Sequence, residues 1–120
     1  MEKSILLVDD KPEIAKIIML YLASYKTKYV ENPIKAIAWL KEGNIPDIII
    51  SDLNMPEMTG EEFLLYLKSN EMFKDIPVLI LSSVESSENR IRLFEEGAED
   101  FILKPFNPEE LKVRVKRILR

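Results

Sequence analysis

Short apolar runs alternate five times along the chain with longer segments in which apolar residues recur at helical spacing. The most apolar runs span 5–8, 48–50, 78–81 and 101–103, and a more polar one spans 27–30. A short continuous apolar run that ends in turn signals is typical of a strand buried on both faces, as in parallel sheets. The pattern therefore predicts four buried strands and, at 27–30, a strand at the edge of the sheet.

The segments between these runs predict helices. Apolar residues between 14 and 22 recur at i, i+3, i+4, i+7 and i+8, which is the spacing of an amphipathic helix. Prolines at 12, 33 and 108 stand where a first helical turn tolerates them, and glycines at 43 and 97 stand where helices end. The other apolar positions expected on helices are Ile37, Leu40, Phe63, Leu64, Leu67, Ile91, Phe94, Leu111, Val115, Ile118 and Leu119.

Five strand–helix units of this length predict an α/β domain in which helices cover both faces of a parallel sheet. Right-handed crossovers must reach both faces, and a flavodoxin-like, doubly wound strand order of 2-1-3-4-5 satisfies that requirement. No linker, repeat or low-complexity tract interrupts the pattern. The 120 residues are therefore expected to form one domain over 1–120.

Charged residues directly follow three of the apolar runs. Asp9 and Asp10 follow the first run, Asp52 ends the third, and Lys104 with Pro105 ends the fifth. Because ligands bind where the carboxyl ends of parallel strands meet, we expect the three acids and the lysine to lie close together. Carboxylates that close repel one another unless a cation lies among them, and hard oxygen ligands favour magnesium.

The composition limits the chemistry available to this site. The chain has no His and no Cys, so imidazole would have to come from a partner, and the absence of Cys fits a reducing compartment such as the cytoplasm. A net charge of −4 disfavours direct nucleic-acid binding by this domain. No stretch approaches the roughly 20 apolar residues of a membrane span, and the three glycines form no nucleotide-binding loop.

Taken together, these residues resemble the receiver domain of two-component response regulators, over essentially the whole chain. The resemblance is carried, in this order and spacing, by Leu7-Val8-Asp9-Asp10, Asp52-Leu53-Asn54-Met55-Pro56, Ser82, and Gly97-Ala98 through Lys104-Pro105-Phe106. It implies a chemotaxis-regulator-like fold and a signalling phosphoacceptor. Such a domain takes phosphate from a phosphohistidine of a sensor histidine kinase or a histidine phosphotransfer domain, and it also phosphorylates and dephosphorylates itself.

The resemblance also implies individual roles at the strand ends. Asp52 is the implied phosphoacceptor. Asp9 and Asp10 would hold Mg²⁺ together with Asp52 and the backbone carbonyl of Asn54. Lys104 would contact the acyl phosphate as a point charge, which suits a single phosphate oxygen.

Three further residues gain implied roles in the response to phosphate. The hydroxyl of Ser82 would sense the phosphoryl group, Phe101 would report the state through its rotamer, and Pro105 would follow a cis peptide bond. Each residue alone also has a simpler explanation. Ser82 suits an ordinary turn, Phe101 suits core packing, and the first two acids suit a helix N-cap.

Two other functions account for part of the same pattern. A phosphatase of the haloacid dehalogenase type also uses an aspartyl phosphate and Mg²⁺, but it needs a second acid where this chain has Asn54, which cannot donate a proton to a leaving group. A protein-binding module that ignores phosphate is disfavoured by the intact acid set. Failure to incorporate phosphate from acetyl phosphate would favour that module.

Charges on the expected fourth helix, fifth strand and fifth helix predict an output face. They resemble the set that pairs across a dimer in the winged-helix, DNA-binding class of response regulators, and a two-fold interface would place such complements opposite one another. The expected pairs are Arg90 with Glu110, Asp100 with Arg114, and Glu95 with Lys116. The alternative is ordinary solvated charges, worth about 0–1 kcal/mol a pair. The sequence leaves open a stand-alone receiver or a piece of a longer protein.

Overall fold

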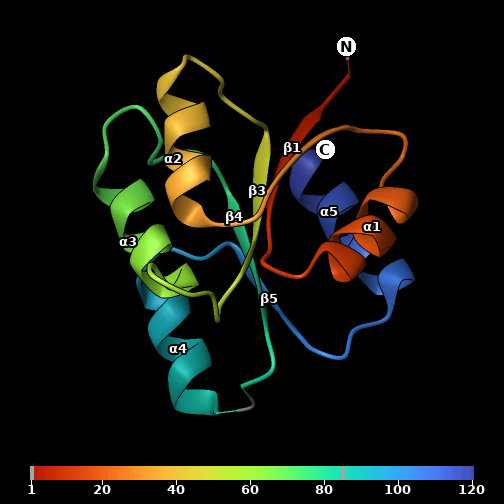
Figure 1. Ribbon diagram of the computed structural model, residues 1–120. Helices are drawn as coiled ribbons and strands as arrows, with labels where there is room; N and C mark the ends of the chain where they lie inside the picture. The colour runs from red at the N-terminus through yellow and green to blue at the C-terminus, as the bar shows by residue number, and fades with distance from the viewer. Residues whose placement is uncertain (1, 85) are drawn as a thin grey trace.

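The computed structural model describes residues 2–84 and 86–120, in which strands and helices alternate from β1 to α5 (Figure 1). The strands are β1 (Ser4–Val8), β2 (Lys26–Val30), β3 (Ile48–Asp52), β4 (Val78–Ser82) and β5 (Asp100–Leu103). The helices are α1 (Pro12–Tyr21), α2 (Pro33–Lys41), α3 (Gly60–Ser69), α4 (Ser87–Glu95) and α5 (Pro108–Leu119).

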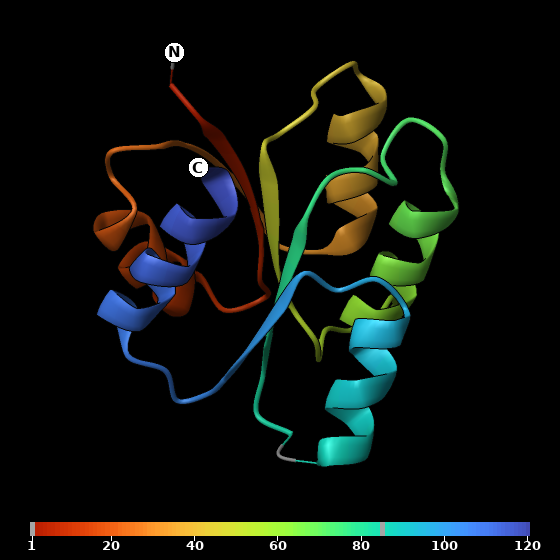
Figure 2. The same cartoon turned by 180° about the vertical axis from the view of Figure 1, so that it is seen from behind.

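The five strands form one parallel sheet in the order β2-β1-β3-β4-β5. Helices α1 and α5 cover one face of this sheet, and α2, α3 and α4 cover the other (Figures 1 and 2). The predicted flavodoxin-like fold and its strand order are therefore confirmed. The predicted edge strand is confirmed as well, because β2 lies at the end of the sheet and alternates exposed with half-buried residues.

Alternate residues of the central strands supply two apolar layers. In β1, Leu6 and Val8 pack with α2, α3 and α4, while Ile5 and Leu7 pack with α1 and α5. β3 and β4 are buried throughout, as expected for strands covered on both faces. Hydrophobic burial on both sides of the sheet thus fixes where each strand ends, and with it the position of the charged residues there.

Helix α4 differs from its predicted pattern. Of the residues of this helix only Leu93 is buried, whereas Ile91 and Phe94 are 59% and 46% exposed. Strand β4 also runs one residue further than predicted, through Ser82. No helix within residues 2–84 and 86–120 is long and apolar enough to cross a membrane.

Helix starts near the carboxyl edge of the sheet are fixed by side-chain caps. Thr59 and Glu62 form a reciprocal capping box at α3, and Asn107 caps α5 by accepting from the backbone N–H of Glu109. Helix α1 starts differently. Its N-cap is Lys11, in extended conformation and without a side-chain cap bond in the described structure, followed by Pro12.

Gly60 ties the loop after β3 back to the end of that strand. Its backbone N–H donates to the carbonyl oxygen of Leu53 at 2.8 Å. A Cβ at this position would overlap the carbonyl oxygen of Asp52 and lie 2.8 Å from the Cα of Leu53. Glycine is therefore required here for close backbone approach, and the contact fixes the segment that carries Asp52.

We predict that Gly60→Ala lowers the free energy of unfolding by about 1–3 kcal/mol, because the added methyl group must displace backbone. It should also shift the amide NMR signals of residues 52–54. Gly43→Ala is the matched control. Its φ of +103° adds backbone strain, but no described atom outside residues 42–44 lies within 4 Å of its Cβ. Unchanged signals at 52–54 in Gly60→Ala, measured beside urea unfolding, would contradict this role.

Candidate functional site

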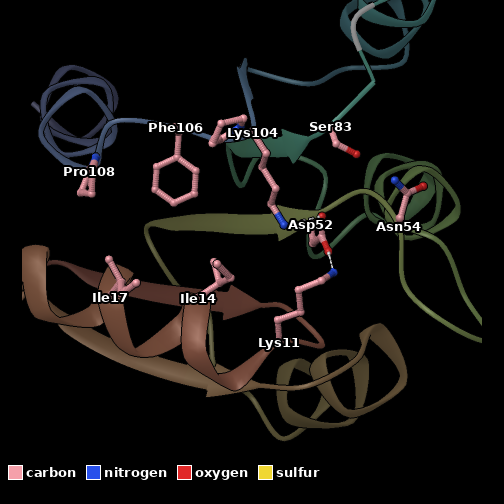
Figure 3. Close-up of a pocket in the computed structure, with 10 residues that line it drawn as sticks. Lys11, Ile14, Ile17, Asp52, Asn54, Ser83, Lys104, Phe106 and Pro108 are labelled. Carbon is pink, nitrogen blue, oxygen red and sulfur yellow. Dashed lines mark hydrogen bonds and ion pairs between the residues drawn. The ribbon is translucent and has the colours of Figure 1, made fainter.

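The carboxyl edge of the sheet brings together the acids predicted to meet there. One carboxylate oxygen from each of Asp9, Asp10 and Asp52 lies within 4.8 Å of the others. The ammonium of Lys104 reaches the same place from the segment after β5 (Figure 3). The predicted convergence of these four side chains is therefore what the structure has.

The two carboxylate oxygens of Asp52 differ in their hydrogen bonding. Its side chain is 3% exposed, and its Oδ1 accepts from the backbone N–H of Leu53 at 2.9 Å and from Lys104 Nζ at 3.1 Å. Its Oδ2 accepts no hydrogen bond from any described residue. The ammonium of Lys11 lies 3.8 Å from Oδ2.

Asp9 repeats this pattern one strand away. It is fully buried, its Oδ1 accepts from the backbone N–H of Lys11 at 2.8 Å, and its Oδ2 has no hydrogen-bond partner within the described ranges. Lys104 Nζ lies 3.7 Å from this Oδ2. Burial raises the pKa of Asp9, although the Lys11 backbone hydrogen bond and the charge of Lys104 partly oppose the shift. We refer to Asp9 Oδ2 and Asp52 Oδ2 as the open oxygens, because both are buried and neither accepts a hydrogen bond from a described residue.

The donor set fits a hard divalent cation. Two buried open oxygens and the carboxylate of Asp10, whose side chain is 30% exposed, form a set of three acidic residues with ligand oxygens within 4.8 Å of one another. This is the arrangement that Mg²⁺ accepts more readily than a closed cage. Asp9 and Asp10 do not serve as the N-cap of α1, which is Lys11.

Lys104 is positioned by its backbone as well as by its charge. Its N–H donates to the carbonyl oxygen of Ser82, which joins the ends of β4 and β5, and the Lys104–Pro105 peptide bond is cis. The Lys104 side chain is only 16% exposed. Its ammonium therefore lies between two carboxylates without much access to water.

The remaining predicted residues lie around this centre. Ser82 is buried at the end of β4, and its Oγ accepts from the backbone N–H of Val84 at 3.0 Å. Asn54 is exposed and lines the cavity above Asp52 (Figure 3). Phe101 is 6% exposed and packs in the layer beneath α2, α3 and α4.

Four features of the site were not anticipated from the sequence. The Tyr29 hydroxyl donates to the backbone carbonyl of Asp9 at 2.7 Å, and burial followed by the charge of Asp9 raises the pKa of that tyrosine. Lys11 reaches the carboxylates, and Ser83 faces the cavity. The cavity, of about 460 Å³, also has an apolar wall of Ile14, Ile17, Pro105, Phe106 and Pro108. Only Lys11 carried a signal in the sequence, since it directly follows the acid pair.

Three of the six charges expected at the output face, Asp100, Glu110 and Arg114, pair with one another within the chain. Arg114 contacts Asp100 at 2.9 Å and Glu110 at 2.7 Å, and it also donates to the carbonyl oxygen of Phe101. The exposed fractions of Ile91, Phe94 and Val113 are 59%, 46% and 57%. This face therefore combines exposed apolar side chains with a cluster of three charges, Asp100, Glu110 and Arg114, that pair within the chain.

Comparisons with known proteins agree with this geometry. A family model described as the response regulator receiver domain matches residues 5–116. The phosphate regulon transcriptional regulatory protein PhoB of Pseudomonas aeruginosa is 38% identical over 98% of this chain, which spans 52% of that protein. The chain thus has about half the length of this relative.

Two solved structures extend the similarity to three dimensions. Chemotaxis response regulator CheY4 of Vibrio cholerae is 33% identical with a TM-score of 0.91, over 99% of this chain and all of that one. The Mn²⁺-bound form of response regulator Rcp1 is 27% identical with a TM-score of 0.82, over 97% of this chain and 91% of that one.

We predict that Asp9→Asn stabilises the protein when divalent cations are removed. Since the pKa of Asp9 is raised in the folded state, its contribution to stability falls as the pH rises from the unfolded to the folded pKa. At pH 7 in EDTA, a neutral amide should raise the free energy of unfolding by about 1 kcal/mol, and the gain should shrink as the pH is lowered.

Urea unfolding measures this effect, with Asp75→Asn as the matched control because Asp75 is exposed and precedes β4, at the edge of the sheet opposite the acid cluster. The control should change stability by less than about 0.5 kcal/mol. A loss of stability in Asp9→Asn under the same conditions would show that the buried carboxylate is not an unfavourable charge.

Proposed function

The chain belongs to the family of response regulator receiver domains, and we propose that residues 1–120 act as a single domain in which Asp52 accepts the phosphoryl group. The observation that carries the proposal is the asymmetry of the Asp52 carboxylate. Oδ1 is held by the Leu53 N–H and Lys104, whereas Oδ2 is an open oxygen beside the cavity. A nucleophilic oxygen must be fixed in position and have a lone pair that is not engaged in a hydrogen bond, and Oδ2 is such an oxygen, although it is buried.

The transfer forms one bond and breaks another. An Asp52 oxygen attacks the phosphorus of a phosphohistidine, a new P–O bond forms, the P–N bond breaks, and the electron pair leaves on the imidazole, which takes up a proton. Because the chain contains no His, the donor belongs to another protein or domain. We propose a sensor histidine kinase or a histidine phosphotransfer domain, in the cytoplasm, where ATP is available to charge the donor.

The residues around Asp52 stabilise the charge that builds up on the phosphoryl oxygens. Lys104 lies 3.1 Å from Asp52 Oδ1 and can exchange that contact for a phosphoryl oxygen without leaving its place. Asp9, Asp10, Asp52 and the Asn54 carbonyl would hold Mg²⁺, which supplies positive charge against the phosphoryl oxygens. Support comes from the two open oxygens and from the similarity to a Mn²⁺-bound response regulator.

We also propose that the domain uses small phosphate donors and hydrolyses its own acyl phosphate. The cavity is lined by Asn54 and Ser83, both of which are exposed. Water can therefore approach the phosphorylated carboxylate from this side. Positioning and charge account for most of the catalysis in phosphoryl transfer, so no further acid or base is required from the chain.

The first test uses acetyl phosphate with Mg²⁺ and intact mass spectrometry. The parent should gain one phosphate, because Asp52 is the one acid of the cluster that lines the cavity, and Asp52→Asn should gain none. Asp75→Asn, which removes an exposed carboxylate, should label like the parent. Persistent labelling of Asp52→Asn would contradict the assignment.

We propose that phosphorylation is read out on the face formed by α4, β5 and α5. The Ser82 hydroxyl, which now accepts from the Val84 N–H, would turn to donate to the phosphoryl group, and Phe101 would follow. The face would then favour a symmetric dimer. Exposed Ile91, Phe94 and Val113 supply apolar area there, which charge pairs alone could not replace.

Pairing across such a dimer requires an exchange of partners. Arg114 now contacts Asp100 and Glu110 of its own chain, so it would give up at least one of them to the second copy. The other two expected pairs are Arg90 with Glu110 and Glu95 with Lys116. The PhoB relative is named a transcriptional regulatory protein. A transcriptional output through a further domain is therefore part of the proposal.

We predict that beryllium fluoride with Mg²⁺ shifts the parent toward a dimer in sedimentation velocity. Ser82→Ala should still take up the phosphate mimic but lose most of the shift, since it lacks the hydroxyl that reports it. Arg114→Glu should remain monomeric because it places like charges at the interface. A parent that stays monomeric with the mimic bound, at high protein concentration, would contradict the dimer and favour a different partner.

A further inference from the structure

A second lysine reaches the acid cluster from the side opposite Lys104. The ammonium of Lys11 lies 3.5 Å from Asp10 Oδ1 and 3.8 Å from the open oxygen of Asp52. Figure 3 shows both lysines pointing at Asp52, Lys104 from the β5 side and Lys11 from the α1 side. Lys11 therefore contacts two of the three carboxylates that fit a divalent cation.

The backbone of Lys11 fixes the place from which its side chain extends. Its N–H donates to Asp9 Oδ1 at 2.8 Å, and its φ of −109° and ψ of 101° keep it extended just before α1. The backbone of Lys11 is thus hydrogen-bonded to Asp9, and its ammonium lies near the carboxylates of Asp10 and Asp52. Pro12 follows directly and starts the helix, so the direction of the chain after Lys11 is fixed as well.

The charge of the cluster shows what Lys11 does there. Three carboxylates and the two lysines sum to −3 + 2 = −1. A divalent cation would bring that sum to +1, whereas without Lys11 the sums would be −2 and 0. Each added positive charge within a few ångströms opposes the binding of another. Lys11 therefore makes the empty cluster more stable and the metal-loaded one less so.

The two lysines differ in how easily they can leave. Lys104 is 16% exposed, and its backbone is held to the end of β4. The side chain of Lys11 is 55% exposed, and exposed ion pairs are weak. Lys11 can therefore swing into solvent when another cation arrives, while Lys104 stays to meet the phosphoryl group.

We propose that Lys11 is a tethered cation that competes with Mg²⁺ for the oxygens of Asp10 and Asp52 and so sets the affinity of this domain for the metal. The inference rests on the proposed function, because it assumes that these carboxylates hold Mg²⁺. Lys11 is a positioning residue in this account. It acts on the metal site, and through it on how much of the protein is ready for phosphoryl transfer at a given Mg²⁺ concentration.

The test is a titration with MgCl₂ alone, without any phosphate donor, followed by the amide NMR signals of residues 9–11 and 52–54. Lys11→Met removes the charge and keeps the length of the side chain. We expect it to bind Mg²⁺ about three- to tenfold more tightly than the parent, with the difference shrinking as salt is added. Lys11→Arg keeps the charge and should stay within about twofold of the parent.

Lys16→Met is the matched control, since Lys16 is an exposed lysine on α1. If the effect is specific to Lys11, Lys16→Met should bind Mg²⁺ with the affinity of the parent. Equal tightening in Lys16→Met would overturn the inference, because net charge alone would then explain the result. Parent-like affinity in Lys11→Met would overturn the inference and leave the metal site of the proposed function intact.

A different result marks failure of the proposed function itself. If neither the parent nor any variant shows Mg²⁺-dependent shifts at 9–11 and 52–54, the acid cluster does not hold the metal, and the role of Lys11 falls with it. A second readout does not depend on the metal. In EDTA, Lys11→Met should unfold at lower urea than the parent and Lys16→Met should not, because Lys11, unlike Lys16, lies among the carboxylates and offsets their repulsion.

Discussion

Two carboxylates from neighbouring strands, those of Asp9 and Asp52, lie buried at one edge of the sheet with the ammonium of Lys104 between them. Like charges that are close together and buried oppose folding. Burial raises the pKa of Asp9 despite the nearby Lys104. The cluster persists because the apolar layers on both faces of the sheet fix the strands that carry it. Function is thus built on a locally unfavourable charge arrangement that the rest of the fold holds in place.

This arrangement explains why cations govern the site. Each acid already uses one oxygen in a backbone hydrogen bond, Asp9 with Lys11 and Asp52 with Leu53, so its geometry is set before any ligand arrives. The open oxygens then favour whatever positive charge can reach them. A tethered lysine, a divalent cation and the phosphoryl group bridged by a metal are, in this account, alternative ways to balance the same carboxylates.

The fold and the centre of the site could be predicted because they follow from local pattern. Continuous apolar runs place strand ends, and parallel strands bring those ends to one edge, so Asp9, Asp52 and Lys104 had to meet. What the sequence could not supply was the direction of long side chains and the partners of surface charges. The reach of Lys11 over the acids depends on three-dimensional packing, and so does the pairing of Arg114 within its own chain. The apolar residues of α4 led to a wrong expectation about which of its side chains are buried. Helix α4 buries only Leu93, so its apolar residues do not mark one buried face.

A crystal structure of the protein with Mg²⁺ and beryllium fluoride tests the central claim most directly. The account predicts a fluoroberyllate bound to a side-chain oxygen of Asp52, Lys104 within hydrogen-bonding distance of a fluorine, and a metal ion held by Asp9, Asp10 and Asp52. Lys11 should have moved away from the open oxygen it now faces at 3.8 Å. An adduct on any other carboxylate, or a fully soaked crystal in which Asp52 stays unmodified, would contradict the claim that this charge cluster makes Asp52 the phosphoacceptor.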